Sequence, residues 1–285
     1  MEELGSMSFL STSWVISGFS FLAFVLFAVT QVSGFLASKA SSPAIKSQSS
    51  PPQQDESSVC AEEFVVYPSQ KFDSLEKALP GLDPSRHYVF IARHGQTDMN
   101  AGGFLQGRGV NANLNDIGRE QGRALGDFLK NTKFDTISCS TLIRSYETAE
   151  EILKMNNFMC KATPIAQYVD LEELSWGELE GQCAREEPWR SKFKHTVQMW
   201  REGKNDYKAV NGESPNEVAA RARGALEAIV AQQQESGGGG GGRHLVVSHG
   251  RTIRSLLDGL AGVRMESVPN CGLYCFAWGG GGGRG

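Results

Sequence analysis

Three short stretches of the chain place arginine or histidine close behind an apolar run. Arg93 and His94 follow HYVFIA, Arg144 lies in the turn after FDTISCS, and His249 follows HLVVS. A neutral histidine ring is a nucleophile, and the forked guanidinium of arginine binds phosphate oxygens in pairs. Each stretch alone also fits a solvated strand end or a core histidine. Together they predict a pocket that binds a phosphate group.

The runs before these residues have the length and composition of buried strands. HYVFIA (87–92), FDTISCS (134–140) and HLVVS (244–248) are short and rich in β-branched or aromatic residues. Helical spacing predicts helices from Asn115, over TLIRSYETAEEILK, over 216–234 and over TIRSLLDGLAG. Strands that alternate with helices favour an α/β fold with a mainly parallel sheet. The carboxyl ends of such strands share one edge, where the arginines and histidines converge.

The composition is that of an ordinary globular protein. Of 285 residues, 40% are hydrophobic and 21% are charged. The net charge of -4 gives no indication of a basic surface, so we expect no nucleic-acid partner. The six cysteines lack CxxC spacing, so no metal site or disulfide framework is predicted. The glycines Gly237–Gly242 lack the Lys-Ser/Thr ending of a phosphate-binding loop, and we interpret them as a flexible loop.

The first 40 residues differ from the rest of the chain because they are strongly apolar and almost uncharged. Residues 14–37 are long enough to cross a bilayer as one helix, and the acidic start (Glu2, Glu3) differs from that of a cleaved signal. Lys39 and Lys46 follow the segment, so the positive-inside rule orients the catalytic part toward the cytoplasm. The sequence therefore predicts a membrane protein with a single-pass N-terminal anchor. The alternative is a plastid or secretory targeting segment that is removed by cleavage.

The predicted domain boundaries divide the chain into four parts. Residues 1–40 form the anchor or targeting segment, and residues 41–59 are a Ser/Pro/Gln-rich stretch that we expect to be a flexible tether. Residues 60–278 form the catalytic domain. Residues 279–285 are a glycine-rich tail.

A series of motifs around the predicted pocket resembles the signature of the histidine phosphatase superfamily, in its phosphoglycerate mutase-like branch. The resemblance covers roughly residues 86–276 and implies a three-layer α/β/α sandwich with a mainly parallel sheet. The motifs, in chain order, are RHGQT with Asn100, NLNDIGREQG, Ser140-x-Leu142-x-Arg144-x3-Thr148-Ala149, Leu171-x-Glu173-x3-Gly177-x2-Glu180-Gly181, Gly212-Glu213-Ser214 and VVSHG (246–250).

The resemblance also implies a role for each residue of the pocket. His94 matches the nucleophile that takes the phosphoryl group onto a ring nitrogen. Arg93, Arg144 and His249 match the residues that bind the phosphoryl oxygens, and Asn100 matches an asparagine that adds a hydrogen bond to phosphate. Because positive charge nearby favours the neutral form of a histidine, the arginines also help to activate His94.

Glu173 matches the acid that protonates the leaving alcohol and then, as a base, prepares water to hydrolyse phosphohistidine. From the residues alone Glu172 is an equal candidate, and only the family's spacing to Gly177 selects Glu173. The resemblance implies that neither a metal nor another cofactor is required.

The resemblance does not choose between a phosphatase and a mutase. The motif from Leu171 to Gly181 matches the family's acid-bearing loop, called the acid loop below. True phosphoglycerate mutases carry extra basic residues after this loop, including paired arginines, that hold a bisphosphorylated ligand. The matching region here has Trp200-Arg201-Glu202 and, earlier, Glu186-Glu187. Less positive charge favours water as the acceptor, so we expect a metal-independent phosphoric monoester hydrolase that acts on a phosphorylated small molecule. The alternatives are phosphoglycerate mutase-type phosphoryl transfer and a catalytically weak phospho-ligand-binding module.

Overall fold

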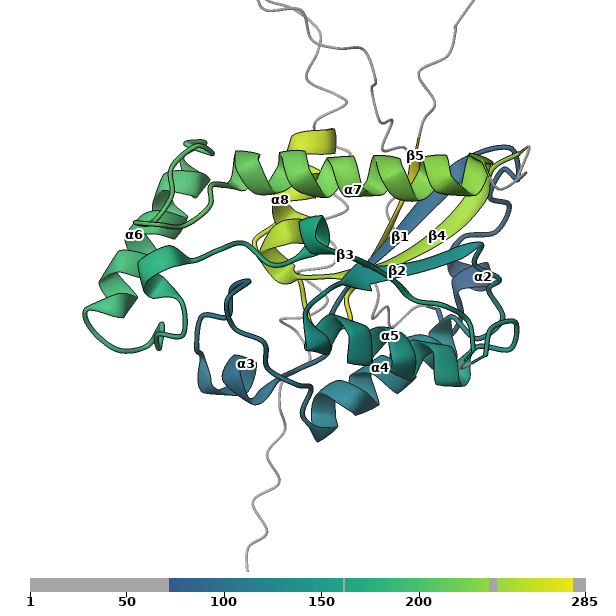
Figure 1. The fold of residues 1–285 in the computed structure, drawn as a ribbon, viewed down its shortest axis with the longest axis horizontal. Coiled ribbons are helices and arrows are strands. Elements are labelled where there is room, and N and C mark those ends of the chain that lie inside the picture. The colour runs from purple at the N-terminus through teal and green to yellow at the C-terminus, as the bar shows by residue number, and fades with distance from the viewer. Residues whose placement is uncertain (1–71, 161, 236–239, 279–285) are drawn as a thin grey trace, which may run out of the picture. The chain divides into compact units, whose positions relative to one another are not determined.

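The computed structural model describes residues 72–160, 162–235 and 240–278, which are built around a five-stranded sheet (Figure 1). The strand order is β3-β2-β4-β1-β5, and only β5 is antiparallel to its neighbour. The prediction of a mainly parallel sheet is confirmed. The strands are β1 (His87–Arg93), β2 (Thr136–Ser140), β3 (Ala166–Tyr168), β4 (Gly242–Ser248) and β5 (Leu273–Trp278).

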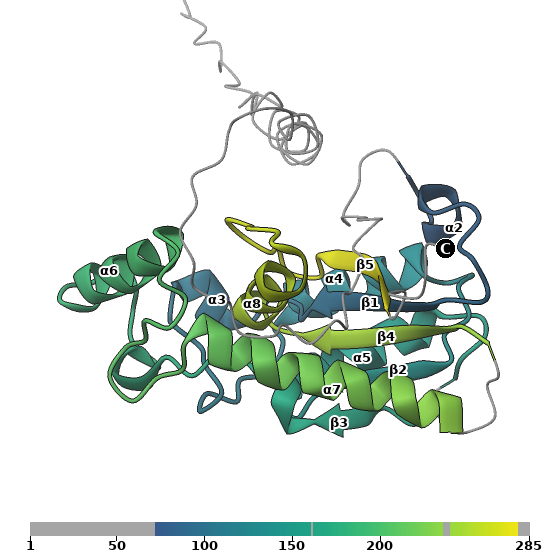
Figure 2. The same ribbon diagram turned by 90° about the horizontal axis from the view of Figure 1, so that it is seen from above.

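Helices cover both faces of the sheet, which makes three layers. Figure 1 shows α7 and α8 on one face and α4 and α5 on the other. Figure 2 shows α3 and α6 beyond the end of the sheet toward which β4 points. The helices are α2 (Leu75–Ala78), α3 (Asp98–Gly102), α4 (Asp116–Phe128), α5 (Ile143–Met155), α6 (Trp189–Arg201), α7 (Pro215–Glu235) and α8 (Gly250–Ala261), with 3-10 turns η1 (Val169–Leu171) and η2 (Gly177–Leu179).

The apolar strands are explained by burial on both faces. Successive side chains of a strand point to opposite faces, so Phe90 packs into the core under α4 and α5 while Val89 and Ile91 pack against α7 and α8. A third apolar cluster surrounds Trp176 and Trp200, where α6 and η2 meet. This cluster was not predicted from the sequence, and neither was β5.

Several predicted boundaries agree with the structure and one does not. Asn115 begins α4 as predicted, and its side-chain oxygen accepts a hydrogen bond from the Gly118 amide. The glycine run was predicted to be a loop throughout, but Gly242 belongs to β4, opposite His87 in β1. Residues 236–239 lie outside the described residues.

The prediction of a single-pass anchor and a membrane location is corrected. In the ranges that the structure describes, no helix is both long and apolar enough to cross a membrane. The longest of them, α7, carries charged side chains such as Glu217, Arg221 and Glu227 along its length. The proposed anchor (14–37), the tether (41–59) and the tail (279–285) lie outside the described residues.

Two buried histidines pair at the amino ends of β1 and β4. The side-chain amide nitrogen of Gln234 donates to Nε2 of His87, at 3.1 Å. The hydrogen of the neutral His87 ring is therefore on Nδ1, which donates to Nε2 of His244, at 3.0 Å. Nδ1 of His244 lies 2.9 Å from the hydroxyl of Thr136. Burial and then His87 lower the pKa of His244 to about 4, although Asp135 opposes the shift. The pair is therefore neutral near pH 7.

This pair predicts a loss of stability in acid. Because the pKa of His244 is lower in the folded protein than its unfolded value of 6.5, the unfolded chain binds a proton more readily than the folded one. The free energy of unfolding is therefore highest above pH 6.5 and decreases as the pH falls toward 4. Between pH 7 and pH 4, the wild type should lose on the order of 2 kcal/mol more than His244→Gln. Urea unfolding at both pH values measures the difference, and equal losses in the two proteins would contradict the prediction.

Candidate active site

His94 and His249 directly follow two neighbouring parallel strands and therefore lie side by side. Arg93 at the end of β1 lies opposite Ser248 at the end of β4, and the His94 amide donates to the Ser248 carbonyl at 3.0 Å. The ring centroids of His94 and His249 are 5.1 Å apart, and both side chains are buried. The convergence expected from the sequence is therefore present in the fold.

A backbone hydrogen bond determines which nitrogen of His94 has a lone pair. Nδ1 lies 2.7 Å from the carbonyl oxygen of Gly95, which only accepts, so Nδ1 carries the proton and Nε2 is bare. Burial, then Arg144 and Arg93, lowers the pKa of His94 well below its ordinary value. Since the ring is neutral, Nε2 is available as a nucleophile.

Two glycines allow the turn after β1 to approach α4. A Cβ on Gly95 would lie 2.4 Å from the carbonyl oxygen of Gly118, and a Cβ on Gly118 would lie 2.1 Å from that of Gln96. The Gly95 amide donates to Thr148, whose hydroxyl donates to the carbonyl of Arg144. The turn that carries His94 is thus connected to α5.

Arg144 is completely buried at the first turn of α5. Its terminal nitrogens donate to the carbonyls of Val110, at 2.6 Å, and Gly107, at 3.2 Å. Burial lowers the pKa of Arg144 to about 10, opposed by the charge of Glu173, so it remains a cation at neutral pH. The guanidinium is held rigidly beside the two histidines.

Three buried donors of the pocket have no hydrogen-bond partner among the described residues. They are Nε of Arg93, Nε of Arg144 and Nδ1 of His249. Nε2 of His249 lies 2.7 Å from the hydroxyl of Ser140 and 3.1 Å from that of Ser145. Either hydroxyl can donate to Nε2, and Nδ1 then carries the hydrogen. Because buried donors are normally satisfied, three unused ones around His94 match the needs of an oxyanion.

The two candidate acids have different surroundings, a distinction that the sequence alone did not provide. Glu172 forms an ion pair with Arg108, at 2.9 Å, and accepts a hydrogen bond from Thr141. Glu173 instead lies at the start of α8, where it accepts bonds from the amides of Arg251 and Thr252. Its charge acts on both Arg93 and Arg144. Glu172 also acts on Arg144, but more weakly, so Glu173 is the acid that is coupled more strongly to the phosphate pocket.

Arg221 supports the acid loop and was missed in the sequence analysis. Its guanidinium donates to the carbonyls of Asp170, Glu172 and Glu173 and pairs with Glu213. The available signal was its position on α7, close in sequence to the Gly212-Glu213-Ser214 motif.

Among the described residues, no group of three His, Cys, Asp or Glu side chains is arranged to hold a metal ion.

A family model confirms the resemblance on which the site was predicted. The model described as "Histidine phosphatase superfamily (branch 1)" matches residues 89–284. The chain belongs to the histidine phosphatase superfamily. Within this superfamily, "Fructose-2,6-bisphosphatase TIGAR B" of Danio rerio is 29% identical over 187 residues, which are 63% of this chain and 65% of that protein.

A second relative is named for a different activity. "Probable phosphoglycerate mutase GpmB" of Erwinia tasmaniensis is 28% identical over 190 residues, which are 65% of this chain and 82% of that protein. The solved phosphoglycerate mutase of Bacillus anthracis superposes with a TM-score of 0.57 at 24% identity, covering 69% of this chain and 90% of that one. It confirms the fold. The chain spans 65%, 35% and 50% of the lengths of three TIGAR relatives that it matches.

Within the described residues, the side chain of Asn100 forms hydrogen bonds with Thr97 and with no other predicted pocket residue. Its side-chain oxygen accepts bonds from the amide and the hydroxyl of Thr97, both at 3.2 Å, and so caps α3. Its amide nitrogen is left as the group that can donate to a ligand.

The close approach of the His94 turn to α4 predicts a stability effect. Gly118→Ala places a methyl group against the Gln96 carbonyl, so we expect a loss of about 2 kcal/mol in the free energy of unfolding. The control is Gly224→Ala on α7, where no atom lies within 4 Å of the added Cβ. That change should stabilise the protein by about 0.5 kcal/mol. Denaturant unfolding measures both, and an unchanged midpoint for Gly118→Ala would refute the packing argument.

Proposed function

We propose that the chain is a phosphatase that hydrolyses small phosphomonoesters through a phosphohistidine on His94. The observation that carries the proposal is the hydrogen bond from His94 Nδ1–H to the Gly95 carbonyl, which leaves a neutral Nε2 beside unused donors of Arg93, Arg144 and His249. The catalytic unit of this proposal is residues 60–278, preceded by the segments 1–40 and 41–59.

In the first step, Nε2 of His94 forms a bond to phosphorus while the bond from phosphorus to the alcohol oxygen breaks. Arg93, Arg144 and His249 donate to the three phosphoryl oxygens, with Asn100 as a further donor, and stabilise their charge in the transition state. Glu173 gives its proton to the leaving oxygen.

In the second step, ionised Glu173 accepts a proton from water as the water oxygen attacks phosphorus. The bond between phosphorus and Nε2 breaks, inorganic phosphate leaves, and His94 is neutral again. The amides of Arg251 and Thr252 stabilise the carboxylate that this step requires. The same residue thus serves as acid and base in turn.

Charge pairing in the region after the acid loop favours hydrolysis over transfer to a second substrate. Lys192 pairs with Glu178, Lys204 with Glu202, and Lys208 with Glu217. Because these three lysines already have carboxylate partners, none of them is free to help retain a bisphosphate. The second candidate is phosphoryl transfer of the mutase type, supported by the similarity to the probable phosphoglycerate mutase of Erwinia tasmaniensis.

Removal of the nucleophile tests the proposal. His94→Ala should lower phosphate release from p-nitrophenyl phosphate by at least about 1,000-fold, because no other group of the pocket can form the covalent intermediate. The assay contains EDTA, and the control is His195→Ala on α6, whose side chain is exposed and contacts Tyr207 edge-to-face. Equal release by wild type and His94→Ala would overturn the proposal. Interconversion of 2- and 3-phosphoglycerate without net phosphate release would favour the mutase.

The leaving group tests the assignment of the acid. Glu173→Gln should lower kcat for glycerol 3-phosphate by about 100-fold or more, since an alkoxide needs a proton to leave. With p-nitrophenyl phosphate the same variant should release a burst of p-nitrophenol and then turn over slowly, because only the second step needs the base. Glu172→Gln is the matched control. If it shows the larger loss and the burst, Glu172 is the acid.

A further inference from the structure

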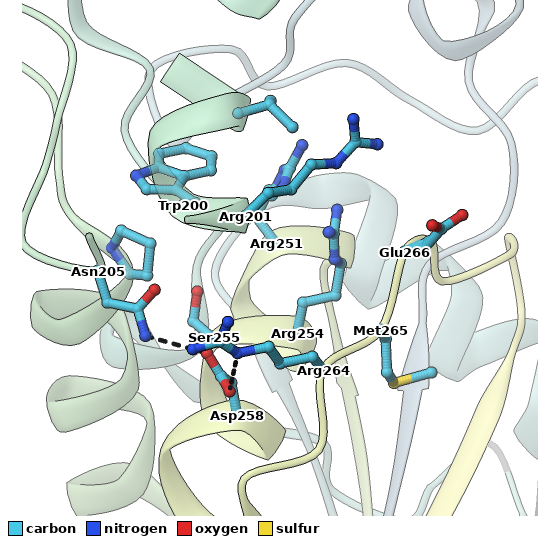
Figure 3. Close-up of a pocket in the computed structure, with 12 residues that line it drawn as sticks. Trp200, Arg201, Asn205, Arg251, Arg254, Ser255, Asp258, Arg264, Met265 and Glu266 are labelled. Carbon is cyan, nitrogen blue, oxygen red and sulfur yellow. Dashed lines mark hydrogen bonds and ion pairs between the residues drawn. The ribbon is translucent and has the colours of Figure 1, made fainter. Parts of the chain in front are cut away.

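A cavity of about 200 Å³ lies beside the phosphate pocket and has no role in the steps described above. It is lined by the C-terminal part of α6, one face of α8 from Arg251 to Asp258 and residues 264–266, with Asn205 and Pro215 (Figure 3). Neither His94 nor His249 lines it. Four arginines contribute to its walls: Arg201, Arg251, Arg254 and Arg264. This concentration of positive charge in so small a space calls for a physical explanation.

Three of the four guanidiniums have no hydrogen bond or ion pair within the described ranges: those of Arg201, Arg251 and Arg254. Figure 3 shows all three directed into the same part of the cavity. The fourth, Arg264, pairs with Asp258 at 3.4 Å.

The three unpaired cations disfavour one another's charge. Burial and then Arg254 lower the pKa of Arg251 to about 9, and burial and then Arg201 lower that of Arg254. Glu266 also lines the cavity and attracts Arg254, but it forms no ion pair with it. A bound anion would relieve this repulsion.

Arg251 is held in a fixed position by two tryptophans. Its guanidinium carbon lies 5.4 Å from the ring centroid of Trp176 and 5.0 Å from that of Trp200. Such cation–π contacts orient the planar group but leave its N–H donors unused. Arg254 follows three residues later on α8 and therefore projects from the same face of the helix. The donors are thus preorganised for a carboxylate or a phosphate.

Glu173 lies between this cavity and the phosphate pocket. Its carboxylate accepts a hydrogen bond from the Arg251 amide at 3.2 Å. Its charge acts on Arg93 and Arg144 on one side and on Arg251 and Arg254 on the other. Because Glu173 protonates the leaving oxygen in the proposed reaction, the leaving group extends from the phosphate pocket toward the cavity.

We propose that Arg201, Arg251 and Arg254 form a second anion subsite, which binds a carboxylate or phosphate carried by the leaving group of the substrate. This inference rests on the proposed phosphatase function and narrows its substrate class to small phosphomonoesters with a second anionic group. It also corrects the expectation of low positive charge at the pocket mouth. That expectation considered the residues around Arg201 alone, whereas the fold adds Arg251 and Arg254 from α8.

A series of three substrates, each with one more anionic group than the one before, tests the subsite. The full-length protein is assayed with glycerol 3-phosphate, which has no second anion, with 3-phosphoglycerate, which adds a carboxylate, and with 2,3-bisphosphoglycerate, which adds a phosphate. The wild type should prefer at least one of the two substrates with a second anionic group over glycerol 3-phosphate in kcat/KM. In Arg254→Met this preference should fall by about tenfold or more, the loss expected when a charged hydrogen-bond donor is removed.

The matched control is Arg264→Met, which removes the same charge from the same cavity wall but leaves the three proposed donors. Its preference should equal that of the wild type. The inference is overturned if the wild type has no preference, if Arg254→Met retains it, or if Arg264→Met loses it to the same extent. The substrate that shows the larger effect identifies the second group as carboxylate or phosphate.

A binding measurement separates failure of this inference from failure of the proposed function. Calorimetry on His94→Ala compares the Kd of 3-phosphoglycerate, 2,3-bisphosphoglycerate and glycerol 3-phosphate, with and without Arg254→Met. If no substrate is hydrolysed but the Arg254-dependent preference in Kd remains, the phosphatase proposal fails and the subsite stands. If hydrolysis occurs but neither kcat/KM nor Kd depends on Arg254, the subsite is refuted and the phosphatase stands.

Discussion

In the pairing of β1 with β4, Arg93 lies opposite Ser248, so the residues that follow the two strands leave the sheet side by side. His94 and His249 are those residues, and their ring separation of 5.1 Å follows from the strand spacing. Both strands are buried on both faces, and a shift of register by one residue would exchange the side chains that face α4 and α5 with those that face α7 and α8. The packing of the core therefore also holds His94, the proposed nucleophile, beside His249.

Burial of several cations is the electrostatic cost of this arrangement. Arg144 is fully enclosed, and its terminal nitrogens are satisfied by backbone carbonyls rather than by a carboxylate. A carboxylate paired tightly with Arg144 would neutralise the charge that an oxyanion needs. Glu173 instead attracts Arg93 and Arg144 from the start of α8, where backbone amides hold it in place. The pocket thus keeps positive charge available and keeps His94 neutral at the same time.

Much of this could be predicted from local sequence. The strand runs, the Asn115 cap and the arginines and histidines behind the strands carry short-range signals, and the structure brings Arg93, His94, Arg144 and His249 together. Other features depend on contacts between distant segments. The choice between Glu172 and Glu173 depends on Arg108 and on the amides of α8. The last strand, β5, is an apolar run next to glycines, and only its pairing with β1 identifies it as part of the sheet.

The first turns of α8 contribute to both the phosphate pocket and the neighbouring cavity. His249 precedes the helix, the amides of Arg251 and Thr252 hold Glu173, and the guanidiniums of Arg251 and Arg254 point into the neighbouring cavity. The amides act whatever side chain residue 251 carries, so the position of Glu173 does not require an arginine there. The arginine at 251 needs a separate explanation, because it is half-buried near other cations and its charge is disfavoured. Its stacking on two tryptophans offsets part of that cost, and an anionic group of the substrate would offset more.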